Sequence, residues 1–142
     1  MTEAPVAGLF LDELKKRLKW FRGAGRSDWE ISLAATYLEK RDYLRATIYA
    51  SEAYITREVE ATSEDISDFA YRDIVRKKMA SASHDFKIFT YVRNSLAHGV
   101  NAGNKEAVAL LADEQLMRQK IKNFIISFNT KLPGGTPVRD TL

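Results

Sequence analysis

The stretch HDFKIFTYVRNSLAHG, residues 84–99, has the spacing of an amphipathic helix. At about 100° per residue it separates into two faces. One face carries Asp85 and four apolar residues that we expect to pack on a core: Ile88, Phe89, Val92 and Leu96. The other face is polar and carries Tyr91, Asn94, Ser95 and His98. The pattern predicts a helix over 84–97, followed by a turn that begins at Gly99.

Arg93 does not share the polar face. It precedes His98 by five residues, so the two side chains project about 140° apart around the axis. In one regular helix they cannot easily hold the same phosphate. The helix could loosen near Gly99, or two copies could pair about a twofold axis so that both Arg–His sets line one cleft. We favour the dimer, because it distorts neither helix.

Helical spacing extends over most of the chain. The three prolines stand at positions 5, 133 and 137, so none breaks the interval between them. We expect helices over 9–21, 27–40, 43–61, 67–79 and 104–128, the last interrupted near Asp113. Ser27 and Glu30 have capping-box spacing, and Asp42 and Asn104 are expected N-caps. The prediction is an all-α bundle of five or six helices over 1–132, with a flexible tail over 133–142.

The composition fits one globular domain. The chain has 142 residues, of which 45% are hydrophobic, so it can bury a core. It has no cysteine, which excludes thiolate metal sites, thiol catalysis and disulfides, and favours a reducing compartment. No apolar run approaches the length that crosses a bilayer, and residues 1–8 lack the features of a signal peptide. We therefore expect a cytoplasmic protein without membrane contact.

Positive charge is concentrated in two places, although the net charge is only +3. The first has six cations and no acid: Lys15, Lys16, Arg17, Lys19, Arg22 and Arg26. The second has Arg118, Lys120 and Lys122. Such patches attract a phosphate backbone, although solvated helix faces account for the charge equally well. The candidate RNA-binding residues are Lys15, Lys16, Lys19 and Arg22.

Arg93, Asn94 and His98 suit metal-independent RNA cleavage. An imidazole can take a proton from a 2′-hydroxyl or give one to a leaving 5′-oxygen. A guanidinium can hold the phosphate and stabilise charge on phosphorus, and an amide can orient the imidazole. His84 lies about 21 Å along the helix from His98, too far to share a metal. We expect no metal and no cofactor. A structural role is the alternative: a histidine before glycine often interacts with the helix dipole, and a lone arginine is usually an ion-pair partner.

The segment Arg93-Asn-Ser-Leu-Ala-His98 resembles the R-x4-H signature of the HEPN superfamily, and the helical surroundings over about 9–128 are similar to a HEPN bundle. HEPN domains are typically dimeric, and many are metal-independent endoribonucleases. The resemblance implies cleavage of single-stranded RNA to a 2′,3′-cyclic phosphate at a site shared by a homodimer. Arg93, Asn94 and His98 would occupy the catalytic positions.

Within the superfamily, residues 35–46, Glu52-Ala53 and 94–99 resemble the C-terminal HEPN domain of CRISPR-associated CARF–HEPN ribonucleases. Those proteins sense cyclic oligoadenylate through a CARF domain, which this chain is too short to contain. We expect either the effector domain of such a defence protein, working with a CARF sensor, or a stand-alone HEPN toxin with an antitoxin partner.

Three residues are candidates for supporting roles. Glu52 falls inside an apolar stripe formed by Ile48, Ile55 and Val59, where an unpaired carboxylate is costly. It contacts and orients Arg93, supplies an acid at the edge of the cleft, or reaches water from the edge of the stripe. We expect Tyr91 and Ser95 to lie on the cleft or dimer face.

Two non-catalytic interpretations remain open. Residues 35–46 also resemble one tetratricopeptide hairpin, but a solenoid needs several repeats and only one is visible. Alternatively, the chain is a catalytically silent HEPN bundle that dimerises or binds RNA. The intact pair of Arg93 and His98 argues against the silent bundle.

Overall fold

The computed structural model describes residues 25–62, 65–99, 101 and 103–130. These residues form helices and no strands, as predicted. The helices are α2 (Arg26–Glu39), α3 (Tyr43–Ala61), α4 (Phe69–Ala82), α5 (His84–His98), α6 (Lys105–Ala112) and α7 (Glu114–Thr130). Within the described ranges, no helix is long and apolar enough to span a bilayer. The helix expected over 9–21 and the tail over 133–142 lie outside them.

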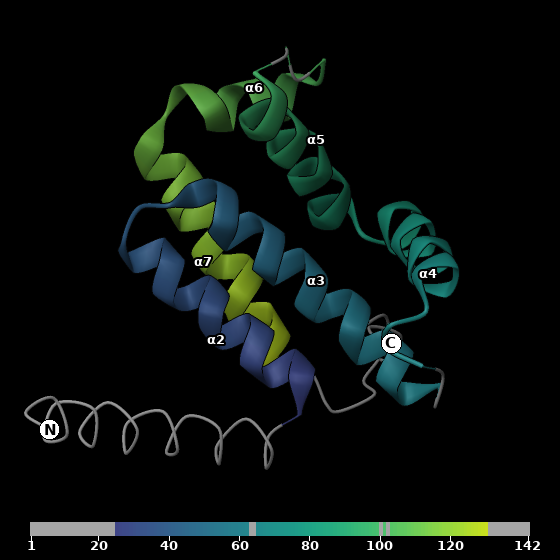
Figure 1. Cartoon of the computed structure of the whole chain (residues 1–142). Helices are drawn as coiled ribbons and strands as arrows, with labels where there is room; N and C mark the ends of the chain where they lie inside the picture. The colour runs from purple at the N-terminus through teal and green to yellow at the C-terminus, as the bar shows by residue number, and fades with distance from the viewer. Residues whose placement is uncertain (1–24, 63–64, 100, 102, 131–142) are drawn as a thin grey trace, which may run out of the picture.

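Helix α3 is the centre of the fold. It contacts α2, α4, α5 and α7, whereas α6 joins the end of α5 to α7 (Figure 1). Helix α4 stands at the edge, and among the described helices it packs mainly against α3 and α5. The short loops between successive helices make neighbours in sequence neighbours in space. A charged side chain on α3 that points toward α4 and α5 is therefore close to side chains of both of these helices.

The buried face of α3 is wider than the predicted stripe. Ile55 and Val59 are fully buried, as expected, but Ile48 remains partly exposed. Several small residues are buried in its place: Ala46, Ala50, Ser51 and Ala53. A helix with partners on several sides buries residues around much of its circumference, and small side chains let those partners approach. A single apolar stripe therefore describes α3 poorly.

Aromatic side chains fix α3 to α7 and α5. The Tyr54 hydroxyl donates a 2.7 Å hydrogen bond to the Phe124 carbonyl, and the two rings stack with centroids 4.6 Å apart. Phe89 packs on the other side of Phe124, with centroids 4.8 Å apart. The Arg57 guanidinium lies 4.0 Å from the ring centroid of Phe128 and donates to its carbonyl. These contacts hold α5 in a fixed position on the bundle.

The helix boundaries follow local caps. Five side chains directly before helices accept a hydrogen bond from the backbone N–H three residues further on: Asp42, Asp68, Ser83, Asn104 and Asp113. Asp42 and Asn104 confirm the prediction, and so does the break at Asp113 between α6 and α7. Helix α4 begins two residues later and ends three residues later than expected. Its start follows Asp68, which supplies the cap.

The capping box predicted for Ser27 and Glu30 is wrong. Helix α2 begins one residue earlier, after Gly25, and has no side-chain cap. The Ser27 hydroxyl donates instead to Glu60 of α3 at 2.8 Å. Glu30 is 3% exposed, and its Oε2 accepts from Arg26 Nε at 3.2 Å. The close packing of α2 on α3 buries both side chains, and Ser27 contacts α3 instead of capping α2.

Glu30 provides a test of the buried charge in this packing. Burial raises the pKa of its carboxyl above 4.5, and the Thr56 hydroxyl and the guanidinium groups of Arg26 and Arg72 only partly oppose this. Its Oε1 is buried without a hydrogen bond. A carboxyl whose pKa is raised by folding contributes stability below its unfolded pKa and loses that contribution as pH rises through the folded pKa. As the pH rises from 4.5 to neutrality, the free energy of unfolding of Glu30→Gln should therefore increase relative to that of the wild type.

Urea denaturation of both proteins across that pH range measures the difference. The exposed Glu39→Gln on the same helix is the matched control and should follow the wild type. Parallel curves for Glu30→Gln and the wild type would contradict the account.

Candidate functional site

Helix α5 carries the predicted site and is regular to its end. The Ser83 hydroxyl caps its start, and Gly99 ends it in the left-handed conformation with φ of 66°. The Gly99 N–H donates to the Ser95 carbonyl at 2.8 Å, which closes the last turn. Because the helix continues through His98, the single chain does not show the loosening that would bring Arg93 and His98 together.

The core face of α5 agrees with the prediction except at its C-terminal end. The buried residues are Phe86, Ile88, Phe89 and Val92. Phe86 was not predicted, and Leu96 is 38% exposed although it was expected in the core. Leu96 lies in the last turn of α5, where it is less covered than Ile88 and Val92 of the preceding turns. This end of α5 is open to another molecule.

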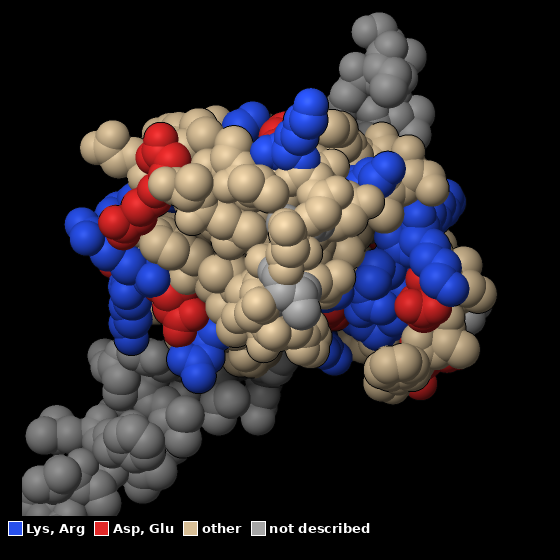
Figure 2. Space-filling model, turned by 90° about the horizontal axis from the view of Figure 1, so that it is seen from above, with Lys and Arg blue, Asp and Glu red and all other residues tan. Residues whose placement is uncertain are grey.

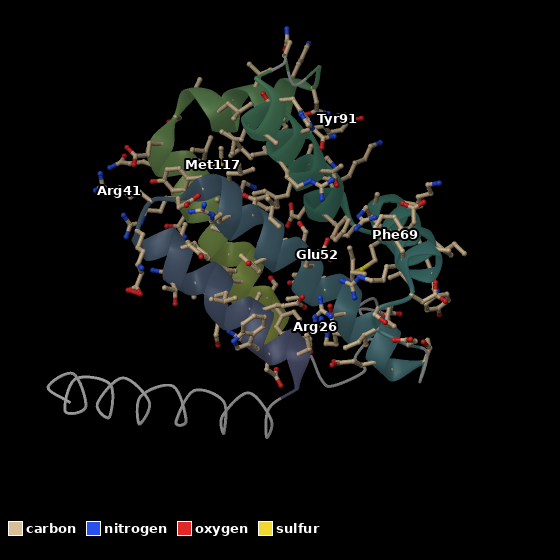
Figure 3. All side chains as sticks on the ribbon, in the orientation of Figure 1. Arg26, Arg41, Glu52, Phe69, Tyr91 and Met117 are labelled. Carbon is tan, nitrogen blue, oxygen red and sulfur yellow. The ribbon has the colours of Figure 1, made fainter. Side chains whose placement is uncertain are left out.

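The polar face of α5 presents two of the candidate catalytic residues to solvent. Asn94 and His98 are exposed and are neighbours at i and i+4. Tyr91 and Ser95 are half-buried on the same side, and Tyr91 packs against the core. Figure 3 shows Tyr91 on the outer side of α5, away from α3. The structure thus keeps an amide and an imidazole side by side at an accessible helix end.

Arg93 occupies a different environment. It is half-buried and makes no hydrogen bond or ion pair with any residue that the structure describes. Burial lowers the pKa of its guanidinium, the positive charge of Arg76 lowers it further, and Glu52 opposes both effects. Arg93 therefore faces α3 and α4 while His98 faces solvent, as the 140° offset requires.

Glu52 does not make the expected direct contact with Arg93. Its Oε1 accepts from Arg72 Nη2, and its Oε2 accepts from Arg76 Nη2 at 3.2 Å. Figure 3 shows Glu52 on α3, on the side that faces α4 and α5. The Glu52 carboxylate is therefore paired with Arg72 and Arg76, two arginines one turn apart on α4. The Glu52 side chain keeps 22% of its surface exposed, so it also has some contact with water, as expected for a residue at the edge of the stripe.

Arg72 and Arg76 are residues that the sequence analysis missed. The Arg72 side chain is 9% exposed and also donates to the Ile66 carbonyl at 3.0 Å. Arg76 is partly buried and contacts Asp73 as well, at 3.3 Å. Their spacing of i and i+4, together with a carboxylate inside an apolar stripe, was the available signal. We call Arg72, Arg76, Arg93 and Glu52 the arginine cluster.

The remaining charged candidates lie apart from this cluster. Lys15, Lys16, Lys19 and Arg22 are outside the described residues. Arg118 and Lys122 line a surface hollow of about 350 Å³ beside the apolar Ile125 and Ile126. His84 pairs with Glu106 at 2.7 Å. In the described ranges, no three His, Asp or Glu side chains are arranged to hold a metal ion.

The distribution of charge distinguishes two regions of one face. Figure 2 looks down on the end formed by α6 and the C-terminus of α5. Lys and Arg side chains gather at both edges of this view, the α4 side included, with acidic groups among them, whereas the middle of the face has few charged residues. Comparison with protein-family models, curated proteins and solved structures gives no match to this chain.

Proposed function

We propose that this chain is a HEPN-type endoribonuclease that cleaves single-stranded RNA without a metal. Arg93, Asn94 and His98 form its catalytic set, and the active site is completed by a second copy of the chain. The function is proposed to serve prokaryotic defence, as a CRISPR-associated effector or as the toxin of a toxin–antitoxin pair.

The observation that carries this proposal is that the Arg93 guanidinium makes no ion pair with any residue that the structure describes. Its nearest acidic neighbour, Glu52, is already paired with two arginines. Keeping a half-buried guanidinium without an anion is unfavourable, so its retention needs a reason outside the fold. A phosphodiester is an anion that a guanidinium binds with two parallel hydrogen bonds.

The chemistry follows from the positions of the imidazole and the guanidinium. His98 of one protomer takes the proton from the 2′-hydroxyl, and the 2′-oxygen forms a bond to phosphorus. The bond from phosphorus to the 5′-oxygen breaks, and the same His98, now protonated, gives that oxygen the proton. Arg93 stabilises the charge on the phosphoryl oxygens, and Asn94 orients the imidazole. The products are a 2′,3′-cyclic phosphate and a 5′-hydroxyl.

A twofold dimer is supported by the surface near His98. Leu96 of α5 is 38% exposed and Val108 of α6 is 45% exposed, and the middle of this end has few charges (Figure 2). Exposed apolar side chains in a weakly charged region suit contact with a second protein surface. Pairing there would place α5 beside its copy, and each Arg93 could then approach the other chain's His98.

RNA cleavage in EDTA tests the proposal. The wild-type protein should cut single-stranded RNA in the presence of EDTA, and His98→Ala should be at least about 100-fold slower. The new 5′ ends should accept a phosphate from a kinase without prior dephosphorylation. DNA of the same sequence is the matched substrate control and should remain intact, because it has no 2′-hydroxyl.

His84→Ala is the matched protein control. It removes the other histidine of α5, which is paired with Glu106 far from the catalytic end, and cleavage should persist. Cleavage that survives His98→Ala, or that needs a divalent metal, would overturn the mechanism. A dimer that binds RNA without cutting it would support the silent HEPN bundle instead.

A further inference from the structure

The arginine cluster contains more positive charge than the fold needs. Glu52 is paired with Arg72 and Arg76, and the two oxygens of Asp73 are paired with Arg76 and Lys77. With Arg93 included, four cations surround two carboxylates, which leaves an excess of two positive charges. Two of these cations, Arg76 on α4 and Arg93 on α5, are partly shielded from water. Shielding strengthens the attraction for an anion.

Arg76 is redundant as an ion-pair partner. Each carboxylate that it contacts has another cation, because Glu52 keeps Arg72 and Asp73 keeps Lys77 at 3.1 Å. Its Nε is buried and makes no hydrogen bond. If Arg76 turned toward a ligand, both carboxylates would remain neutralised. Arg72 differs, because it is almost fully buried and also holds the Ile66 carbonyl.

Arg76 and Arg93 lie on α4 and α5, two helices that pack against each other. The charge of Arg76 lowers the pKa of Arg93, although the two residues come from different helices. An anion bound by both guanidinium groups would convert this repulsion into attraction. Phosphodiester oxygens can accept hydrogen bonds from two guanidinium groups at once.

We propose that Arg76 and Arg93 form a two-guanidinium clamp for one backbone phosphate of single-stranded RNA. The proposed function identifies the ligand as RNA, and on that function this inference rests. Arg76 thereby becomes a substrate-binding residue on α4, in addition to the catalytic set on α5. The clamp also explains why α4 directs a second arginine toward a carboxylate that Arg72 already neutralises.

The salt dependence of RNA binding measures the clamp directly. Binding of a 2′-O-methyl oligonucleotide, which lacks the attacking hydroxyl, is followed by fluorescence anisotropy at several NaCl concentrations. Loss of one phosphate contact should reduce the slope of log K against log salt by about 0.7. We expect this reduction in Arg76→Gln and in Arg93→Gln, and no further reduction in the double variant, because both residues hold the same phosphate.

Two variants control for charge and position. Arg76→Lys keeps the charge and should keep the slope. Lys78→Gln removes an exposed cation about 200° around α4 from Arg76 and should also leave the slope unchanged. Circular dichroism of Arg76→Gln should show a folded protein, since both carboxylates retain a partner.

A slope unaffected by Arg76→Gln would overturn the clamp, and so would a double variant with twice the single reduction. Inorganic phosphate that binds as tightly as the oligonucleotide would also overturn it, because the site would then suit a free ion. The proposed function fails separately, if the wild type does not cut unmodified RNA. A reduced slope in a protein that never cleaves would retain the clamp and reject the nuclease.

Discussion

Mixing two inactive variants, Arg93→Ala and His98→Ala, is expected to restore RNA cleavage. The two side chains lie about 7.5 Å apart along α5 and about 140° apart around it, so one chain does not direct them to a common point. In the proposed dimer, Arg93 of one protomer works with the partner's His98. A heterodimer of the two variants therefore contains one complete pair.

The expected size of the recovery follows from the symmetry. Each variant alone should be at least about 100-fold slower than the wild type. After full exchange of protomers, about half of the dimers are heterodimers with one of two pairs intact, so the mixture should reach about a quarter of the wild-type rate. Initial rates in EDTA, after co-refolding the two variants, provide the measurement.

The control replaces Arg93→Ala by the double variant Arg93→Ala/His98→Ala. Mixing this protein with His98→Ala cannot create a complete pair, so it should not recover activity. If the original mixture forms dimers but stays inactive, the two residues do not act across the interface, and the composite site is wrong.

Arg72→Met should lower the free energy of unfolding by about 3 kcal/mol. The Arg72 side chain is 9% exposed and donates to both Glu52 and the Ile66 carbonyl. Methionine has a similar length but no donor, so the substitution leaves the Ile66 carbonyl without this bond. Glu52 keeps only Arg76, which places the loss near the lower end of what breaking a buried ion pair costs.

Urea denaturation tests this prediction against Arg45→Met. Arg45 makes a 2.9 Å ion pair with Asp42, but its side chain is 61% exposed, so its removal should cost less than about 1 kcal/mol. Combining Arg72→Met with Glu52→Gln should cost less than the sum of the single changes, because the two residues are in contact. Equal losses for Arg72→Met and Arg45→Met would show that the buried pair contributes nothing beyond a surface pair.

Sequence spacing predicted the features of this protein that depend on neighbours along one helix. Asp42 and Asn104 cap helices through hydrogen bonds to residues three positions away, and the break at Asp113 has the same local origin. The divergence of Arg93 and His98 also follows from the pitch of one helix. Such relations need no knowledge of how the helices pack.

The errors concern contacts between helices. Glu52 pairs with residues 20 and 24 positions later, and which cations reach it depends on how α4 crosses α3. Glu30 looked like part of a cap because its spacing from Ser27 is right, but the approach of α3 buries both. Leu96 has the period of a core residue and yet is 38% exposed. In each case the position of a second helix decides the outcome.

The thin packing of α4 has a consequence for how the protein responds to its ligand. Only Arg72 and Val75 of this helix are buried, and Phe69 and Ile74 are 81% and 61% exposed. Helices held by few apolar contacts detach more readily than the rest of a domain. Because Arg76 is held beside α5 only when α4 is docked, RNA bound by the proposed clamp would bind the docked form alone, and the two equilibria are thermodynamically linked. RNA would then hold α4 in place, and a loosely docked α4 would weaken RNA affinity by the same free energy.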